Sequence, residues 1–87
     1  MRHQDEMRII LNKVMVLDRI YPLCVIYGLV EKHVEFDHDD LVPTPHAQSD
    51  TDLRWKTTVR RALYGARKKG QVERVRPSYH KRIGRIQ

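Results

Sequence analysis

The segment from residue 51 to residue 69 constrains the fold most, because its apolar residues recur at steps of three and four. On an α-helix this spacing gathers them into one narrow apolar stripe. The stripe consists of Trp55, Val59, Ala62, Leu63 and Ala66. Gly70 follows the last turn, where a left-handed residue commonly ends a helix, and the cations before it suit the negative end of the helix dipole. The segment therefore predicts a long amphipathic helix with Trp55 in the core and a basic outer face.

Two further helices are predicted before this one. Residues 5–19 carry apolar side chains at helical spacing, with charged residues between them. Residues 22–33 begin at Pro22, which suits the first turn of a helix, and they also hold one apolar stripe. Cys24 lies in this apolar run and is expected to be a buried thiol. Because the chain has one cysteine, no internal disulfide is expected.

The connection from residue 34 to residue 50 has a different character. Its first residues, "VEF", favour a short strand, and "DHDDLV" favours a turn or a single helical turn. Two prolines spaced two residues apart then disfavour helix and indicate a loop. The loop ends in three candidate N-caps of the long helix, Ser49, Asp50 and Thr51, and Asp52 suits the positive first turn.

The residues after Gly70 predict a β-hairpin over residues 71–83. "QVERV" and "YHKRI" are the expected strands, and Pro77 starts the reversal between them. The expected fold is one α+β, mostly helical domain spanning residues 1–87. A chain of this size buries only about 60–65% of the surface that its unfolded form exposes, which leaves little room for an enclosed active site. We therefore expect a binding module and no enzyme, with no cofactor and no small-molecule substrate.

Charge is distributed very unevenly along the chain. Residues 51–87 carry twelve Lys and Arg against two acids, a net charge of +10, whereas residues 1–50 carry five basic and nine acidic residues, a net charge of −4. Such polarity in a small domain is costly self-repulsion unless a polyanion relieves it, so nucleic acid is the leading partner class. The longest apolar run, "YPLCVIYGLV", is about half of what a membrane crossing needs, and the charged N-terminus is unlike a signal peptide. The default expectation is a cytoplasmic protein, associated with the nucleoid if the source is bacterial.

The basic half also resembles a known family. "WKTTVRRALYGARKKGQVER" followed by "SYHKRI" resembles the winged helix-turn-helix modules of Mrr-type and HNH-type restriction endonucleases, well over residues 52–83 and loosely over 20–84. The matching residues are Trp55, Val59, Arg60, Ala62, Leu63, Gly70, Val72 and Tyr79. The resemblance implies a winged helix, in which 51–69 is the recognition helix and 71–83 the wing. Residues 5–19 are then an extra helix, which completes the three-helix core or pairs two protomers in a homodimer.

The resemblance further implies double-stranded DNA as the partner. The recognition helix enters the major groove, and the wing contacts the backbone or the minor groove. The protein is then a small transcriptional regulator, or the DNA-targeting module of a restriction or mobile-element system, and no nuclease motif follows the wing. The candidate contacts are Arg54, Lys56, Thr57, Thr58, Arg60, Arg61, Tyr64 and Lys68 on the helix and Arg74, Arg76, Ser78, His80, Lys81 and Arg82 on the hairpin.

Within this set, base contacts are expected in the first half of the helix, from Arg54, Thr57, Thr58 and Arg61. Tyr64, Arg67 and Lys68 lie further along and suit phosphate. Any single arginine is about as often solvated or paired within the protein as bound to DNA. Only several arginines on one face therefore indicate a DNA-binding surface. Tyr79, like Trp55, is expected in the core.

Three alternatives remain open. The basic face can dock on an acidic protein surface, or it can bind RNA and associate with the ribosome. A metal-dependent nuclease would use the His and Asp residues of the segment 33–46, which are His33, Asp37, His38, Asp39, Asp40 and His46. The histidines lack the helical spacing of HExxH and no CxxC is present, so we expect neither a metal site nor catalytic residues.

Overall fold

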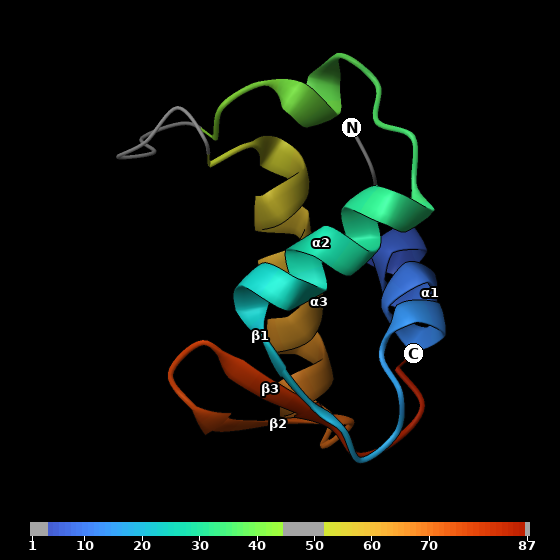
Figure 1. Cartoon of the computed structure of the whole chain (residues 1–87), viewed down its shortest axis with the longest axis vertical. Helices are drawn as coiled ribbons and strands as arrows, with labels where there is room; N and C mark the ends of the chain where they lie inside the picture. Colours follow the sequence, from blue (N-terminus) through green and yellow to red (C-terminus); the bar gives the residue numbers. More distant parts are fainter. Residues whose placement is uncertain (1–3, 45–51, 87) are drawn as a thin grey trace.

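Three α-helices and a small antiparallel sheet are described by the computed structural model, which covers residues 4–44 and 52–86 (Figure 1). Along the chain the elements are α1 (Gln4–Val14), β1 (Ile20–Pro22), α2 (Leu23–His33), the 3-10 turn η1 (Asp39–Leu41), α3 (Arg54–Lys68), β2 (Val72–Arg76) and β3 (Tyr79–Arg82). The long basic helix and the hairpin are thus present as predicted. The described part of the chain is a small α+β domain.

The sheet has the strand order β1-β3-β2, so the last strand lies in the middle. Both pairings are antiparallel; Tyr21 and Arg74 lie on either side of His80. Pro77 and Ser78 form the hairpin turn, and the positive φ of Ser78, 65°, is that of the third residue of a type II turn. The carbonyl of Ser78 accepts a hydrogen bond from the Leu23 N–H (2.7 Å), which ties the turn to the start of α2.

The strand β1 was not predicted, because sequence reasoning extended the first helix to residue 19. That helix ends at Val14 instead. Asp18, four residues after the end of the helix, has φ 63°, a left-handed conformation that turns the chain toward β1. The guanidinium of Arg82 donates to the carbonyls of Asn12 (3.0 Å) and Met15 (2.8 Å) and so satisfies acceptors at the end of α1.

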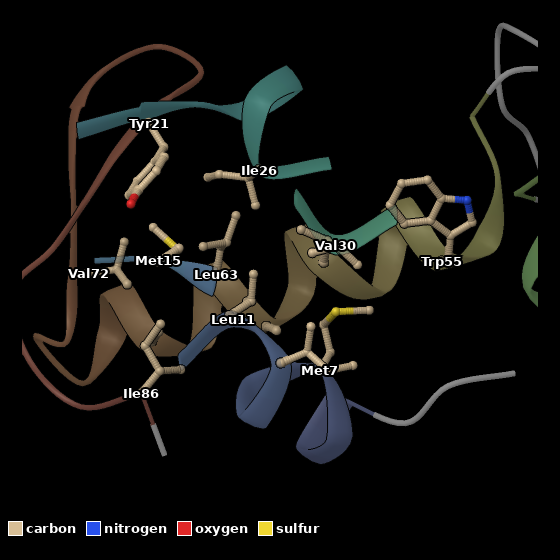
Figure 2. Packing of buried hydrophobic residues seen from close by; sticks show 14 residues of the cluster. Met7, Leu11, Met15, Tyr21, Ile26, Val30, Trp55, Leu63, Val72 and Ile86 are labelled. Atoms are coloured by element: carbon tan, nitrogen blue, oxygen red, sulfur yellow. The ribbon is translucent and has the colours of Figure 1, made fainter. Parts of the chain in front are cut away.

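The core lies between the helices and one face of the sheet (Figure 2). Helix α1 packs against both α2 and α3, so of the two roles expected for the first helix it has the one in which it completes the core. The buried apolar residues are Met7, Ile10, Leu11, Met15, Tyr21, Ile26, Val30, Trp55, Val59, Ala62, Leu63, Ala66, Val72 and Ile86.

Trp55 is buried, as predicted, at 2% exposure. Its ring stacks on Phe36, with 4.6 Å between centroids and 19° between planes, and meets the edge of Tyr27 at 5.6 Å. The expected strand over residues 34–36 is absent from the structure, because this segment leads from α2 to η1 and places Phe36 on Trp55. The expected helical turn after it is present as η1.

The two ends of α3 differ in how well the sequence predicts them. At the C-terminus Gly70 has φ 73°, and its N–H bonds Arg67 O (3.1 Å) while the Gln71 N–H bonds Ala66 O (2.9 Å). This is the Schellman motif that the glycine indicated. At the N-terminus the capping position is Leu53, without a side-chain cap, and the expected caps, Ser49, Asp50 and Thr51, lie outside the described residues.

Two expectations about burial are wrong. Cys24 is exposed, because it lies in the first turn of α2 about half a turn away from the buried Ile26. Tyr79 is 37% exposed, because its neighbour His80 takes the inward position of β3. Among the helices that the structure describes, none is long and apolar enough to cross a membrane.

Candidate nucleic-acid interface

One line of four side chains follows α3 opposite its buried stripe, and three of the four are exposed. Thr57, Arg61, Tyr64 and Lys68 are spaced by four, three and four residues, which places them on one face. Arg61 and Lys68 are exposed, and the Tyr64 side chain is 53% exposed. With Gln4 of α1 they line a shallow groove of about 450 Å³. This face is long, cationic and open to solvent.

Tyr64 is the aromatic centre of this face. The Lys68 Nζ lies 4.7 Å from the centroid of its ring, and the Arg67 guanidinium carbon lies 5.8 Å away. An exposed aromatic ring that two cations flank offers a base or a sugar a stacking surface beside charges for phosphate. The structure thus brings Tyr64, Arg67 and Lys68 together, as the sequence predicted.

The hairpin adds a second set of cations. Arg74 and Arg76 are exposed on β2, and Ser78 is exposed at the turn. The Arg76 guanidinium carbon lies 5.6 Å from the ring centroid of Tyr79, so an aromatic and a cation are again adjacent. Sequence reasoning missed Tyr79 because it assigned the ring to the core. The alternation of the strand is the signal that separates Tyr79 from His80.

A pocket of about 190 Å³ lies where α3 meets the hairpin. It is lined by Leu23, Arg60, Leu63, Tyr64, Arg67, Arg74, Ser78 and His80. The C-terminal half of α3 lies beside the hairpin (Figure 1). The two basic elements are therefore joined at one place.

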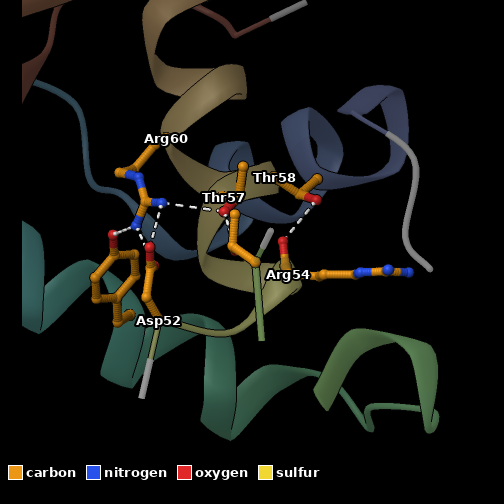
Figure 3. A network of polar contacts seen from close by, with 7 residues as sticks. Asp52, Arg54, Thr57, Thr58 and Arg60 are labelled. Atoms are coloured by element: carbon orange, nitrogen blue, oxygen red, sulfur yellow. Dashed lines mark hydrogen bonds and ion pairs between the residues drawn. The ribbon is translucent and has the colours of Figure 1, made fainter. Parts of the chain in front are cut away.

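Arg60 has a partner within the protein. Its guanidinium donates to both carboxylate oxygens of Asp52 (2.8 and 3.2 Å) and to the Tyr27 hydroxyl (3.0 Å), as Figure 3 shows. The Asp52 carboxylate raises the pKa of Arg60, and burial raises the pKa of Tyr27. Arg60 therefore fixes the start of α3 to α2. Eight residues separate it from Asp52, and nothing in the sequence marks the pair.

The two threonines that were expected at the bases are also engaged. Thr58, an expected base contact, is only 6% exposed, and its hydroxyl donates to the Arg54 carbonyl (3.2 Å). It precedes the buried Ala62 by one turn, which is the signal that places it in the stripe. The Thr57 hydroxyl bonds Thr44 (2.6 Å) and accepts from Arg60 (3.0 Å).

Arg54 and Lys56 lie at the start of α3 and differ in their surroundings. The Arg54 side chain extends away from the polar network around Asp52 and Arg60 (Figure 3). The Lys56 Nζ lies 5.5 Å from the Tyr27 ring centroid and 5.7 Å from that of Trp55. Lys56 thus covers the aromatic cluster beside α2 and does not belong to the exposed line of α3.

Three hairpin residues that were expected to contact DNA are buried, partly buried or bonded within the protein. His80 is 6% exposed, and burial, followed by the charges of Arg67 and Arg74, lowers its pKa. Arg82 is occupied at the end of α1, and its Nε donates to the Gly84 carbonyl. Lys81 is partly buried and lies opposite Glu73 in the sheet. Of the predicted hairpin set, Arg74, Arg76 and Ser78 are thus the exposed members.

The acidic segment before α3 is organised as a turn. The Asp37 N–H donates to the Asp40 carboxylate (3.1 Å) and the Asp40 N–H donates to the Asp37 carboxylate (2.9 Å). The second bond lowers the pKa of Asp37. Over residues 4–44 and 52–86, no group of three or more His, Cys, Asp or Glu side chains is placed to hold a metal ion, and His46 lies outside these ranges.

Comparison of the chain with protein-family models, with curated proteins and with solved structures finds no match.

Proposed function

We propose that this protein binds double-stranded DNA as a winged helix, with α3 in the major groove and the β2–β3 hairpin on the backbone. The observation that carries the proposal is the meeting of two basic, solvent-exposed elements, α3 and the hairpin, around a single pocket. The element order α1-β1-α2-α3-β2-β3 and the strand order β1-β3-β2 agree with the winged-helix layout.

The exposed line of α3 supports a division of roles. The major groove is about 12 Å wide and admits an α-helix. Arg61 is exposed near the middle of α3, and its guanidinium suits a bidentate bond with guanine. Lys68 lies two turns further on and suits phosphate. Arg54 remains a candidate base contact, whereas the burial of Thr58 and the ion pair of Arg60 remove these two from the proposed contact set.

The hairpin supports the role of a wing. Arg74 and Arg76 are exposed on β2, and Ser78 presents its hydroxyl at the turn. A wing of this kind contacts the backbone, or inserts arginine into a narrow minor groove. The proposed interface is therefore Arg54, Arg61, Tyr64, Arg67, Lys68, Arg74, Arg76 and Ser78. Its biological setting is a small transcriptional regulator or the targeting module of a restriction or mobile-element system.

The test is a salt titration of binding to a labelled duplex of about 20 base pairs, followed by fluorescence anisotropy. Four phosphate contacts, from Lys68, Arg74, Arg76 and Arg67, predict a slope of log K against log salt of about −3.6 between about 50 and 200 mM. A slope near zero contradicts the proposal. Tighter binding to a hairpin RNA would favour the RNA alternative, and capture of a specific acidic protein without DNA affinity would favour a protein partner.

A further inference from the structure

The pocket between α3 and the hairpin has a size and a lining that point to a small anion. Its volume of about 190 Å³ equals roughly that of six water molecules in the liquid and is below the roughly 300–1,000 Å³ of sites that enclose a drug-sized ligand. None of its eight lining residues is acidic. Leu23 and Leu63 form an apolar part of the wall, which lowers the local dielectric and strengthens any interaction between charges.

Two cations converge on this pocket from different elements. Arg67 comes from the last turn of α3 and Arg74 from the middle of β2. Neither guanidinium forms an ion pair or a side-chain hydrogen bond within the part of the chain that the structure describes. Both charges act on His80, whose pKa they lower after the larger effect of burial. The third arginine of the lining, Arg60, is neutralised by Asp52.

The imidazole of His80 supplies a second, independent indication of a missing partner. His80 is 94% buried, and its Nδ1 is enclosed without a hydrogen-bond partner among the described residues. Buried polar atoms in native proteins nearly always have a partner, and the His80 residue lines the pocket, so its unmatched nitrogen points to a partner from outside the described residues. Ser78, at the hairpin turn, places a hydroxyl in the same wall.

We propose that this pocket binds one phosphate group, held by Arg67 and Arg74 and further bonded by Ser78 and His80. Guanidinium groups match phosphate oxygens with paired, charge-assisted hydrogen bonds. The group is a backbone phosphate of the duplex or belongs to free phosphate. The first of these rests on the proposed function, and the second does not.

The experiment is an NMR titration of the ¹⁵N-labelled protein with sodium phosphate, against sodium chloride at equal ionic strength. The expected result is saturable, phosphate-specific shifts at Arg74, Ser78 and the His80 imidazole. The variants Arg67→Gln and Arg74→Gln are expected to weaken phosphate binding about tenfold or more, because each removes a charged hydrogen-bond donor. The matched control is Arg19→Gln, which removes an exposed arginine that neither lines the pocket nor belongs to the proposed DNA interface.

Absence of phosphate-specific shifts in the folded wild type would overturn the proposal, as would equal weakening of phosphate binding in Arg74→Gln and Arg19→Gln. A parallel titration with the labelled duplex separates this failure from that of the proposed function. Duplex binding without phosphate binding removes the pocket and leaves the DNA interface. Phosphate binding without duplex binding supports the pocket, with free phosphate as its source, and contradicts the DNA interface.

Discussion

Gly70 and Gly28 differ in whether their backbone conformation favours a residue with a side chain. Gly70 has φ 73° in the Schellman turn, whereas Gly28 lies inside α2, and an added Cβ would meet nothing within 4 Å at either position. Gly70→Ala should therefore lower the free energy of unfolding by about 1–2 kcal/mol, because a left-handed conformation disfavours any L side chain. Gly28→Ala should raise it by about 0.5–1 kcal/mol, because glycine is a poor helix former. Urea unfolding of both variants checks the pair, and a shift of the same sign in both contradicts it.

Arg61 is the residue for which the proposed DNA contact is sharpest. It is exposed on α3, and no hydrogen bond or ion pair of its side chain is found within the described residues. Arg61→Ala should weaken binding to a preferred duplex, found by selection from random sequences, by about 1–3 kcal/mol. Arg19→Ala, an exposed arginine in the connection from α1 to β1, is the control and should change affinity little. An equal loss for preferred and unrelated duplexes would assign Arg61 to phosphate contact.

His80 links the stability of the fold to pH. Burial and the charges of Arg67 and Arg74 lower its pKa below the ordinary 6.5, so the folded protein holds the neutral imidazole. As pH falls below 6.5, the unfolded chain takes up the proton first, and the free energy of unfolding decreases until pH reaches the lower, folded pKa. The slope for this one proton is at most about 1.4 kcal/mol per pH unit.

This prediction is checked by urea unfolding at about pH 7.5 and 5.5. The decrease in the free energy of unfolding between these two pH values should be smaller in His80→Gln than in the wild type. In the control His33→Gln, whose histidine is exposed, the decrease should equal that of the wild type. An NMR titration of the His80 ring protons gives the folded pKa directly, and a midpoint at or above 6.5 would contradict the argument.

At the scale of elements, the start of α3 is held by one polar cluster. Asp52 and Arg60 form a bidentate salt bridge that is partly exposed, with 30% of the Asp52 side chain and 39% of the Arg60 side chain accessible to solvent. Asp52→Asn should lower the free energy of unfolding by about 1 kcal/mol. It should also tighten duplex binding, because it removes a negative charge beside the basic face.

The matched control for Asp52→Asn is Asp5→Asn. Asp5 pairs with Arg8 at 2.6 Å, but its side chain is 70% exposed, so the loss of stability should be smaller. Thermal unfolding and duplex anisotropy of the two variants give both quantities. Weaker duplex binding by Asp52→Asn at unchanged helical content would mean that the cluster orients α3 for DNA, and that its electrostatic effect on DNA is minor.

The elements that sequence predicted well are those whose signals are local. The apolar stripe of α3, Gly70 and Pro77 each act within a few residues, so the long helix, its end and the hairpin turn were predictable. The strand β1 forms because Tyr21 pairs with His80, about sixty residues away in the chain, and three residues carry no periodicity of their own.

The residues of the candidate site also fall into two groups, those that local spacing predicts and those that depend on distant elements. Helical spacing alone places Arg61, Tyr64 and Lys68 on one exposed face. The partners that occupy Arg60 and Arg82 come from distant elements, α2 and α1, and no spacing indicates them. Local spacing does not predict the pocket either, because Arg67 and Arg74 converge on His80 only after the hairpin folds back beside α3.

At the scale of the whole molecule, the charge distribution sets two responses to salt that have opposite signs. Residues 51–87 carry a net charge of +10. Their mutual repulsion destabilises the compact free protein, and added salt screens it over a Debye length of about 10 Å at 0.1 M. The free energy of unfolding of the free protein should therefore rise between low and moderate salt.

With duplex bound, the free energy of unfolding should instead fall as salt rises. A duplex at 100 times its Kd stabilises the fold by about 2.7 kcal/mol, and this gain falls as salt weakens binding. Thermal unfolding across a sodium chloride series, with and without the duplex, should give two curves that converge as salt rises. If salt leaves the free protein unchanged, acidic groups of the chain already neutralise the basic face, and the electrostatic reason for a polyanionic partner is lost.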